Sequence, residues 1–164
     1  MRAPKRIENQ QVREIASLLI PLQGCQLLLP NVSVAEIVPI AQVSSGEGAP
    51  AWYLGSCMWR EQRVPLISYE ILNGDTKPAM HSRARLAVLN STGISEELPF
   101  LALVTQGLPR LARVNEEEIA AHDVEELKPF EAMQVSWAGE EAVIPDIARM
   151  EQAILDYWQT IDSV

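Results

Sequence analysis

Two adjacent side chains, Ser56 and Cys57, are the candidates for nucleophilic chemistry in this chain. Serine hydrolases often present the nucleophile on a sharp turn with a glycine on each side, in the pattern Gly-x-Ser-x-Gly. Gly55 precedes Ser56, but the second glycine is missing and the surrounding residues have the pattern of a strand. A hydrolase that uses Ser56 or Cys57 is therefore an alternative interpretation, which a thiol of low pKa would support.

The other polar residues do not indicate a metal or nucleotide site. His81 and His122 lie in polar stretches without the ligand spacing of a zinc site. The acidic run 116–126 lacks the alternating ligands and central glycine of a calcium loop, and we interpret it as a solvated turn and short helix. Neither glycine-rich phosphate-binding pattern occurs. We therefore expect no metal, no cofactor and no enzyme activity.

The charge of the chain argues against two classes of partner. Its 164 residues include 13 Lys and Arg against 22 Asp and Glu, a net charge of −9. Nucleic-acid binding and attachment to an anionic membrane surface both need a basic face. Hydrophobic residues make up 48% of the chain, which is enough to bury a core. The length fits one domain or two small barrels that share an interface.

The cysteines and the apolar segments indicate in which cellular compartment the protein acts. Cys25 and Cys57 stand 32 positions apart, and we expect two buried free thiols in a reducing compartment. The basic N-terminal segment is not followed by the apolar stretch of a signal peptide. The longest apolar stretches are far shorter than the roughly 20 residues that span a bilayer. The sequence therefore predicts a cytoplasmic protein without membrane insertion.

Short apolar segments separated by turn residues must position these side chains. About ten such segments read as strands, with one or two helical turns expected at 31–38. Because open edges of apolar strands aggregate, this number favours closed β structure. The predicted strands are 17–22, 25–30, 39–43, 53–59, 63–69, 83–89, 100–106, 110–114, 133–137 and 141–144.

The C-terminal segment breaks this pattern. After Pro145, Asp146 can cap a helix over 146–160 whose apolar residues form one stripe, so we expect it to pack on a barrel. The remaining organisation is an N-terminal arm at 1–16 and a domain at 17–158, with an internal subdomain boundary near 73–82. The stripe consists of Ile147, Met150, Ile154, Leu155 and Trp158.

The segment 52–70 carries the most distinctive pattern, two strands around a turn at Arg60, Glu61 and Gln62. Pro65 inside the second strand indicates an edge or a bulge. Arg60 is either a solvated turn residue or an interface anchor, because a guanidinium offers planar, multidentate donors and is enriched at protein contacts. Residue types alone favour neither interpretation.

This segment resembles the CheW-like adaptor domains of bacterial chemosensory arrays. Their hairpin has the form G-V-x-N-L-R-G-x-x-V-P-V-I-D-L, and residues 55–69 of this chain read GSCMWREQRVPLISY. The spacing from Gly55 to Arg60 and on to Val64-Pro65 matches without a gap. Leu29-Pro30 and Val34-Ala35-Glu36-Ile37 resemble elements that precede the hairpin in the family. The resemblance covers residues 17 to about 158.

Four residues depart from the family pattern. Met58 replaces an asparagine, Trp59 a leucine, Glu61 a glycine and Ser68 an aspartate. The glycine-to-glutamate change alters which backbone angles are easy at the turn, and the serine removes a charge. These departures indicate a divergent adaptor. The narrower resemblance is to the ChpC-type variants of chemosensory systems that control type IV pili and twitching motility.

The resemblance implies a mostly β fold, with two SH3-like five-stranded β-barrel subdomains and a C-terminal amphipathic helix. It also implies a non-catalytic adaptor that couples the cytoplasmic tip of a methyl-accepting chemoreceptor to the regulatory domain of a CheA-type histidine kinase. Glu36, Gly55 and Arg60 match family positions tied to receptor contact. Val34 lies beside them and is either an interface or a core residue.

Paired barrels leave a groove between them, which we expect to take a helical hairpin tip through apolar contact, with Arg60 pairing to that tip. A small-ligand-binding β-barrel is a further alternative to the adaptor, and a stabilising metabolite would support it.

Overall fold

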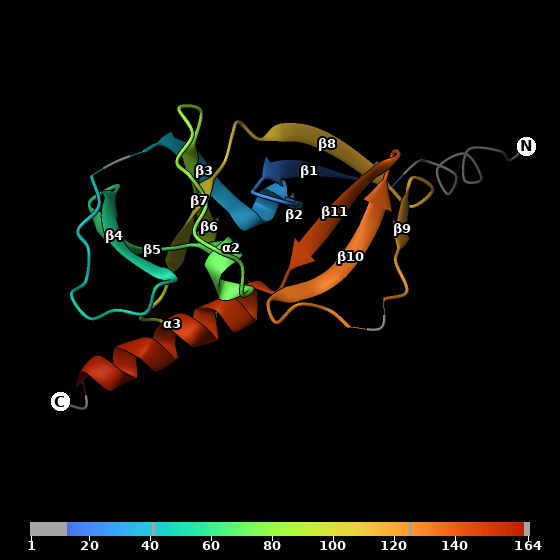
Figure 1. Cartoon of the computed structure of the whole chain (residues 1–164). Coiled ribbons are helices and arrows are strands. Elements are labelled where there is room, and N and C mark those ends of the chain that lie inside the picture. The colour runs from blue at the N-terminus through green and yellow to red at the C-terminus, as the bar shows by residue number, and fades with distance from the viewer. Residues whose placement is uncertain (1–12, 41, 125, 163–164) are drawn as a thin grey trace, which may run out of the picture.

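In the computed structural model of the chain, the described residues are 13–40, 42–124 and 126–162 (Figure 1). Within them the strands form a six-stranded sheet, in the order β8-β1-β2-β11-β10-β9, and a five-stranded sheet, in the order β3-β6-β7-β5-β4. The first sheet comprises β1 (Glu14–Pro21), β2 (Gln26–Pro30), β8 (Arg110–Asn115), β9 (Ile119–Ala121), β10 (Glu131–Trp137) and β11 (Glu140–Pro145). The second comprises β3 (Val34–Pro39), β4 (Tyr53–Trp59), β5 (Gln62–Ile67), β6 (Arg85–Asn90) and β7 (Phe100–Thr105).

Three helical elements accompany the sheets. They are the short 3-10 helix η1 (Asn31–Ser33), α2 (Tyr69–Leu72) and α3 (Ile147–Asp162). Figure 1 shows α3 as a long helix that leaves the junction of the two sheets and ends at the C-terminus. The predicted β-rich fold with a C-terminal helix is confirmed. No helix in the described ranges is long and apolar enough to cross a bilayer.

The chain changes sheet twice. It leaves the first sheet through η1 after β2, and returns to it when β7 leads into β8. The internal boundary expected near 73–82 therefore falls between α2 and β6, inside the segment β3–β7 that forms the second sheet. The glycine and proline of this loop mark a turn, but strand pairing decides which sheet a strand joins. Here β7 pairs in parallel with β5 and antiparallel with β6, which keeps strands before and after the loop together.

Several predicted elements have different bounds in the structure. β1 begins at Glu14 rather than residue 17, because Glu14 pairs with Asn115 of β8. Of the expected arm at 1–16, residues 1–12 lie outside the described residues. The helical turns expected at 31–38 shorten to η1, because the chain from Val34 onward forms β3 and pairs with β6. Three of the six residues of β3 are β-branched, which favours a strand. β3 ends at Pro39, where the sequence predicted a strand over 39–43 to begin. Both β9 and α2 are absent from the sequence prediction. In the described part of the acidic run the expected turn is present, but β9, which pairs with β10, stands where a short helix was expected.

The core is divided into three clusters of buried side chains. One belongs to the second sheet and includes Trp59 and Leu86, and another belongs to the first sheet and includes Leu19 and Leu28. The third joins the two sheets to α3 and includes Met150. Each sheet therefore encloses its own small interior, and the shared cluster holds the sheets and the helix together.

The predicted apolar stripe of α3 faces this shared cluster. Met150 and Ile154 are fully buried, and Ile147, Leu155 and Trp158 pack against the cluster from its margin. Asp146 Oδ1 accepts a hydrogen bond from the Arg149 nitrogen at 3.0 Å. This bond caps the start of the helix, as its residue type predicts.

Candidate functional site

The turn between β4 and β5 presents Arg60 to solvent. Trp59 pairs with Gln62, so Arg60 and Glu61 are the two central turn residues, and their φ angles are 47° and 65°. Two positive φ angles fit the type I′ hairpin turn, whose twist matches that of the flanking strands but which usually contains glycine or asparagine. The Arg60 side chain is 66% exposed. A paired, twisted hairpin thus holds an arginine at its tip.

Arg60 meets Glu36 of β3, the strand at the other edge of the second sheet. Arg60 Nη2 lies 3.2 Å from Glu36 Oε1, and the same oxygen accepts a hydrogen bond from Trp59 Nε1 at 2.8 Å. The guanidinium carbon of Arg60 also lies 4.8 Å from the centroid of the Trp59 ring. These residues, Glu36, Trp59 and Arg60, form what we call the hairpin cluster.

The two contacts to Glu36 differ in strength. An exposed ion pair is typically worth about 0–1 kcal/mol, because water screens it and two long side chains lose freedom. A hydrogen bond to a charged group typically contributes about 1.5–3 kcal/mol. Trp59 is buried, whereas Arg60 is exposed. The Trp59 bond is therefore the firmer anchor of the Glu36 carboxylate.

Gly55 shapes the strand that carries this cluster. It is buried and its φ is +133°, and a Cβ at this position would lie 2.3 Å from the backbone oxygen of Ser44. The backbones of Ser44 and Ser56 exchange two hydrogen bonds, of 2.9 and 3.0 Å, directly beside it. A side chain at Gly55 would prevent that approach, so the residue acts through backbone geometry and not as an exposed contact.

Val34 lies at the start of β3, opposite Leu89 of β6. It is half-buried and packs against the core cluster shared by the two sheets. The structure therefore brings Glu36 and Arg60 into direct contact, while Val34 contacts the protein interior and Gly55 lies beneath the surface.

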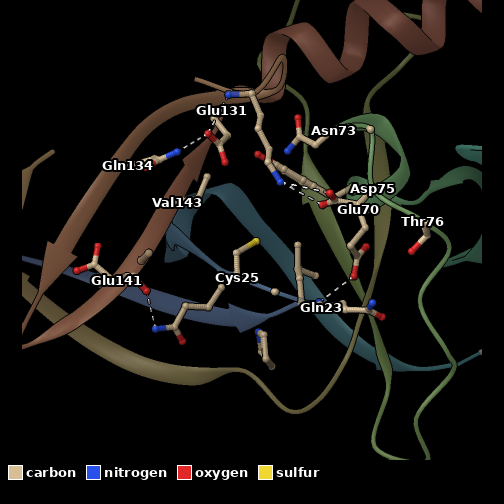
Figure 2. Close-up of a pocket in the computed structure, with 18 residues that line it drawn as sticks. Gln23, Cys25, Glu70, Asn73, Asp75, Thr76, Glu131, Gln134, Glu141 and Val143 are labelled. Atoms are coloured by element: carbon tan, nitrogen blue, oxygen red, sulfur yellow. Dashed lines mark hydrogen bonds and ion pairs between the residues drawn. The ribbon is translucent and has the colours of Figure 1, made fainter. Parts of the chain in front are cut away.

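A second feature is a cleft of about 1000 Å³ between the first sheet and α2 with its following loop (Figure 2). The β1–β2 turn, α2 with its following loop, β10 and β11 line it. Its carboxylates are Glu70, Asp75, Glu131 and Glu141, and its single lining amine, Lys128, lies 3.3 Å from Asp75. The cleft is thus more acidic than the apolar groove that the sequence analysis expected.

The hairpin cluster and the cleft are separate surfaces. None of the three residues of the hairpin cluster lines the cleft. The expectation that Arg60 pairs with a segment seated in the groove stays a prediction, and such a segment would have to extend beyond the cleft to reach Arg60. The β4–β5 turn lies at the tip of the second sheet, whereas the cleft is formed where α2 faces the first sheet.

The cysteines differ in exposure. Cys57 is buried as predicted, but Cys25 is exposed, because it lies in the turn between β1 and β2. Figure 2 shows the Cys25 side chain within the cleft, with Glu70 and Glu131 among the labelled walls. Burial of the thiol against the cleft wall, and then the carboxylates of Glu70 and Glu131, raise the pKa of Cys25 to about 11.

Neither candidate nucleophile has an activating environment. Burial raises the pKa of the Cys57 thiol, the opposite of what a nucleophilic cysteine requires. The Ser56 hydroxyl accepts a hydrogen bond from Arg63 Nη1 at 3.0 Å. His122 is half-buried and its Nε2 contacts Ser136 and Glu141 instead. Within the described ranges no cluster of three or more His, Cys, Asp or Glu side chains could hold a metal ion.

The contacts of two side chains were not predicted from the sequence. Trp59 departs from the leucine of the family pattern, but its bond to Glu36 was not foreseen. Ser68 is noted as the loss of a charge, but its hydroxyl accepts a hydrogen bond from the Ile71 nitrogen at 3.2 Å and caps α2. Serine and aspartate are both good caps, so the cap is retained. A serine followed by an acidic residue in the first turn is the signal that could have revealed it.

The chain is similar to proteins of one known family. The family model described as the CheW-like domain matches residues 16–154. The crystal structure of the scaffolding protein TtCheW from Thermoanaerobacter tengcongensis superposes with a TM-score of 0.69 at 15% sequence identity, covering 81% of this chain and 89% of that one. At this identity the likeness shows the fold, and it confirms the predicted pair of SH3-like barrels. The first sheet has six strands rather than the five expected, because β9 adds to β10. A search of curated proteins found no match.

Proposed function

Because the chain belongs to the CheW-like domain family, we propose that it is a non-catalytic adaptor of chemosensory signalling that couples a chemoreceptor to a CheA-type histidine kinase. The receptor contributes its cytoplasmic tip and the kinase its regulatory domain. The adaptor acts in the cytoplasm and binds its partners without transforming them.

The contact between Arg60 and Glu36 is the observation that carries this proposal. Both residues match family positions tied to receptor contact, and they lie 3.2 Å apart on an exposed surface. Arginine at a rigid turn is a favourable interface anchor, since little conformational freedom is lost when a partner binds. We therefore assign the receptor tip to the hairpin cluster.

The acidic cleft supports the same function in a different way. An adaptor must hold two partners at once, and the cleft is a concave surface distinct from the exposed hairpin cluster. Its volume of about 1000 Å³ is large enough for a helical segment to enter. We propose that the cleft is available to a helical hairpin of one partner while Arg60 engages another.

The narrower assignment concerns the signalling system. The departures at Met58, Trp59, Glu61 and Ser68 alter the hairpin that the family uses. We propose that they adapt the chain to a system that controls type IV pili and twitching motility.

A reconstitution tests the adaptor function. The chain is mixed with the receptor cytoplasmic fragment and the kinase regulatory domain encoded nearest to its gene, and the mixture is separated by size-exclusion chromatography with light scattering. We expect a ternary complex that forms only when the chain is present. Two partners that bind each other equally well without the chain, or a chain that binds neither, would refute the coupling role.

A further inference from the structure

We propose that Trp59 is a positioning residue for partner recognition: it fixes Glu36, so that the Arg60 guanidinium is free to pair with a carboxylate on the partner. This inference rests on the proposed adaptor function and deepens it, because it names the chemical group that the hairpin cluster recognises. It concerns a residue that departs from the family pattern, so the family resemblance does not supply it.

Trp59 is held firmly by the second sheet. Its side chain is 8% exposed and belongs to that sheet's core cluster. The Phe100 ring meets it edge to face, with centroids 4.8 Å apart. Pairing of its backbone with Gln62 fixes the strand. The indole N–H therefore points at Glu36 from a position that does not depend on any partner.

Glu36 accepts two hydrogen bonds through one oxygen. Oε1 accepts from Trp59 Nε1 at 2.8 Å and from Arg60 Nη2 at 3.2 Å, and the described residues supply no hydrogen bond to Oε2. If Arg60 turns away, the Trp59 bond remains and the carboxylate keeps a donor. A leucine at position 59 would leave Arg60 as the sole donor in this set, and Arg60 would be bound to Glu36 more exclusively.

Arg60 keeps most of its donors unused. A guanidinium has five N–H groups, and within the described part of the chain only Nη2 has a hydrogen-bond acceptor. The side chain is 66% exposed and rests against the Trp59 ring. A carboxylate matches the fork of paired N–H groups better than a single carbonyl does, so we assign a carboxylate to the partner.

Long-range attraction does not provide this selectivity. The hairpin and the facing strand carry Arg60 and Arg63 against Glu36 and Glu61, so their charges balance. Arg63 Nη1 is already bonded to the Ser56 hydroxyl at 3.0 Å. Recognition of an acidic group must therefore come from the short-range contact of a released Arg60.

Binding measurements on Trp59→Phe test the proposal. This variant keeps the ring against Phe100 and Arg60 but removes the N–H, and Trp52→Phe is the matched control in a different aromatic group. The probe is the receptor cytoplasmic fragment that the wild-type chain binds, titrated by calorimetry. We expect Trp59→Phe to weaken binding about fivefold, because Glu36 then competes for Arg60 by about the strength of one hydrogen bond, and Trp52→Phe to leave it unchanged.

Two further variants show whether Trp59 acts through Arg60. In an Arg60→Gln background, Trp59→Phe should weaken binding no further. In the receptor tip, each Asp or Glu is changed in turn to Asn or Gln. One of these changes should weaken binding to the wild-type chain but leave binding to the Arg60→Gln variant unchanged. Additive effects of the two chain variants, or a tip without such an acidic residue, would overturn the inference.

A measurement on the chain alone separates this inference from the proposed function. The coupling between Arg60→Gln and Glu36→Gln is determined from urea unfolding, in the wild-type and in the Trp59→Phe background. We expect stronger coupling without the indole N–H, because Arg60 is then the remaining donor. Equal coupling in both backgrounds would overturn the inference even if the adaptor function holds, and absence of any receptor binding would refute that function alone.

Discussion

The carboxylate of Glu151, wholly buried in α3, accepts hydrogen bonds from both the backbone nitrogen and the hydroxyl of Thr92, at 2.7 and 2.6 Å. Thr92 lies in the loop between β6 and β7 of the second sheet. Because α3 follows directly on β11 of the first sheet, this contact ties the two barrels together through the helix.

We therefore expect Glu151→Ala to lower the free energy of unfolding by about 2–4 kcal/mol, since it removes charge-assisted bonds from a buried site and leaves a void. The measurement is urea unfolding followed by circular dichroism. Gln152→Ala, on the exposed side of the same helix turn, should change the value by less than about 0.5 kcal/mol. Equal effects of the two variants would show that the Glu151 contact does not hold the helix.

Gly55→Ala should strongly destabilise the folded chain. The new Cβ would meet the Ser44 oxygen at 2.3 Å while the backbone holds a φ of +133°. We expect a loss of about 3 kcal/mol or more in unfolding free energy. Gly74→Ala is the matched control, with a φ of +88° and no atom within 4 Å of the added Cβ, and should cost about 1 kcal/mol. The idea fails if both variants unfold at the same urea concentration.

Ser68→Ala removes the side-chain cap of α2 and should lower the unfolding free energy by about 1 kcal/mol. Ser68→Asp restores the residue of the family pattern and should match the wild type, because aspartate accepts the same bond from the Ile71 nitrogen. Thermal melts of the three proteins make the comparison. A destabilised Ser68→Asp would mean that the position requires a neutral side chain.

Cys25 should react slowly with iodoacetamide at neutral pH, although it is exposed. The thiolate is the reactive form, and the pKa of this thiol is raised to about 11. In a Cys57→Ala background, the rate should rise about tenfold per pH unit until it levels near pH 11. A plateau near pH 8.5, the ordinary thiol value, would contradict this account of the cleft.

The same raised pKa links folding stability to pH. The folded chain holds the Cys25 proton more tightly than the unfolded chain does, so this contribution to stability is fully present below pH 8.5 and is lost as the pH rises towards 11. The comparison is urea unfolding of wild type and Cys25→Ser at pH 8 and pH 10.5, where the wild type should lose more stability than the variant. Equal losses in the two proteins would argue against a raised pKa in the folded state.

Local patterns in the sequence predict local structure well. The spacing of Met150 and Ile154 identifies the buried face of α3, and the segment around Arg60 identifies the β4–β5 hairpin. Sheet membership could not be predicted, because it depends on pairings between distant segments. Val143 of β11 pairs with Leu27 of β2, and no local pattern encodes that contact.

For the candidate site, the sequence predicts which residues take part but not how they contact one another. Glu36 and Arg60 are both identified by resemblance, but their contact depends on how the second sheet curls to bring its two edge strands, β3 and β4, together, which the sequence does not reveal. Trp59 is missed for the same reason, since its N–H gains a role only when Glu36 lies beside it. Cys25 is misplaced because an apolar neighbourhood in sequence does not distinguish a strand from the turn that ends it.

Charge reversal at Arg60 tests the central claim most directly. Calorimetry would compare the wild-type chain and Arg60→Glu for binding to the receptor cytoplasmic fragment, with thermal melts to confirm that both are folded. We expect the variant to bind the receptor about 5- to 150-fold more weakly, the range for an interface arginine worth roughly 1–3 kcal/mol. Binding to the kinase regulatory domain should be unchanged. Unaltered receptor affinity in a folded Arg60→Glu protein would contradict the assignment of this surface.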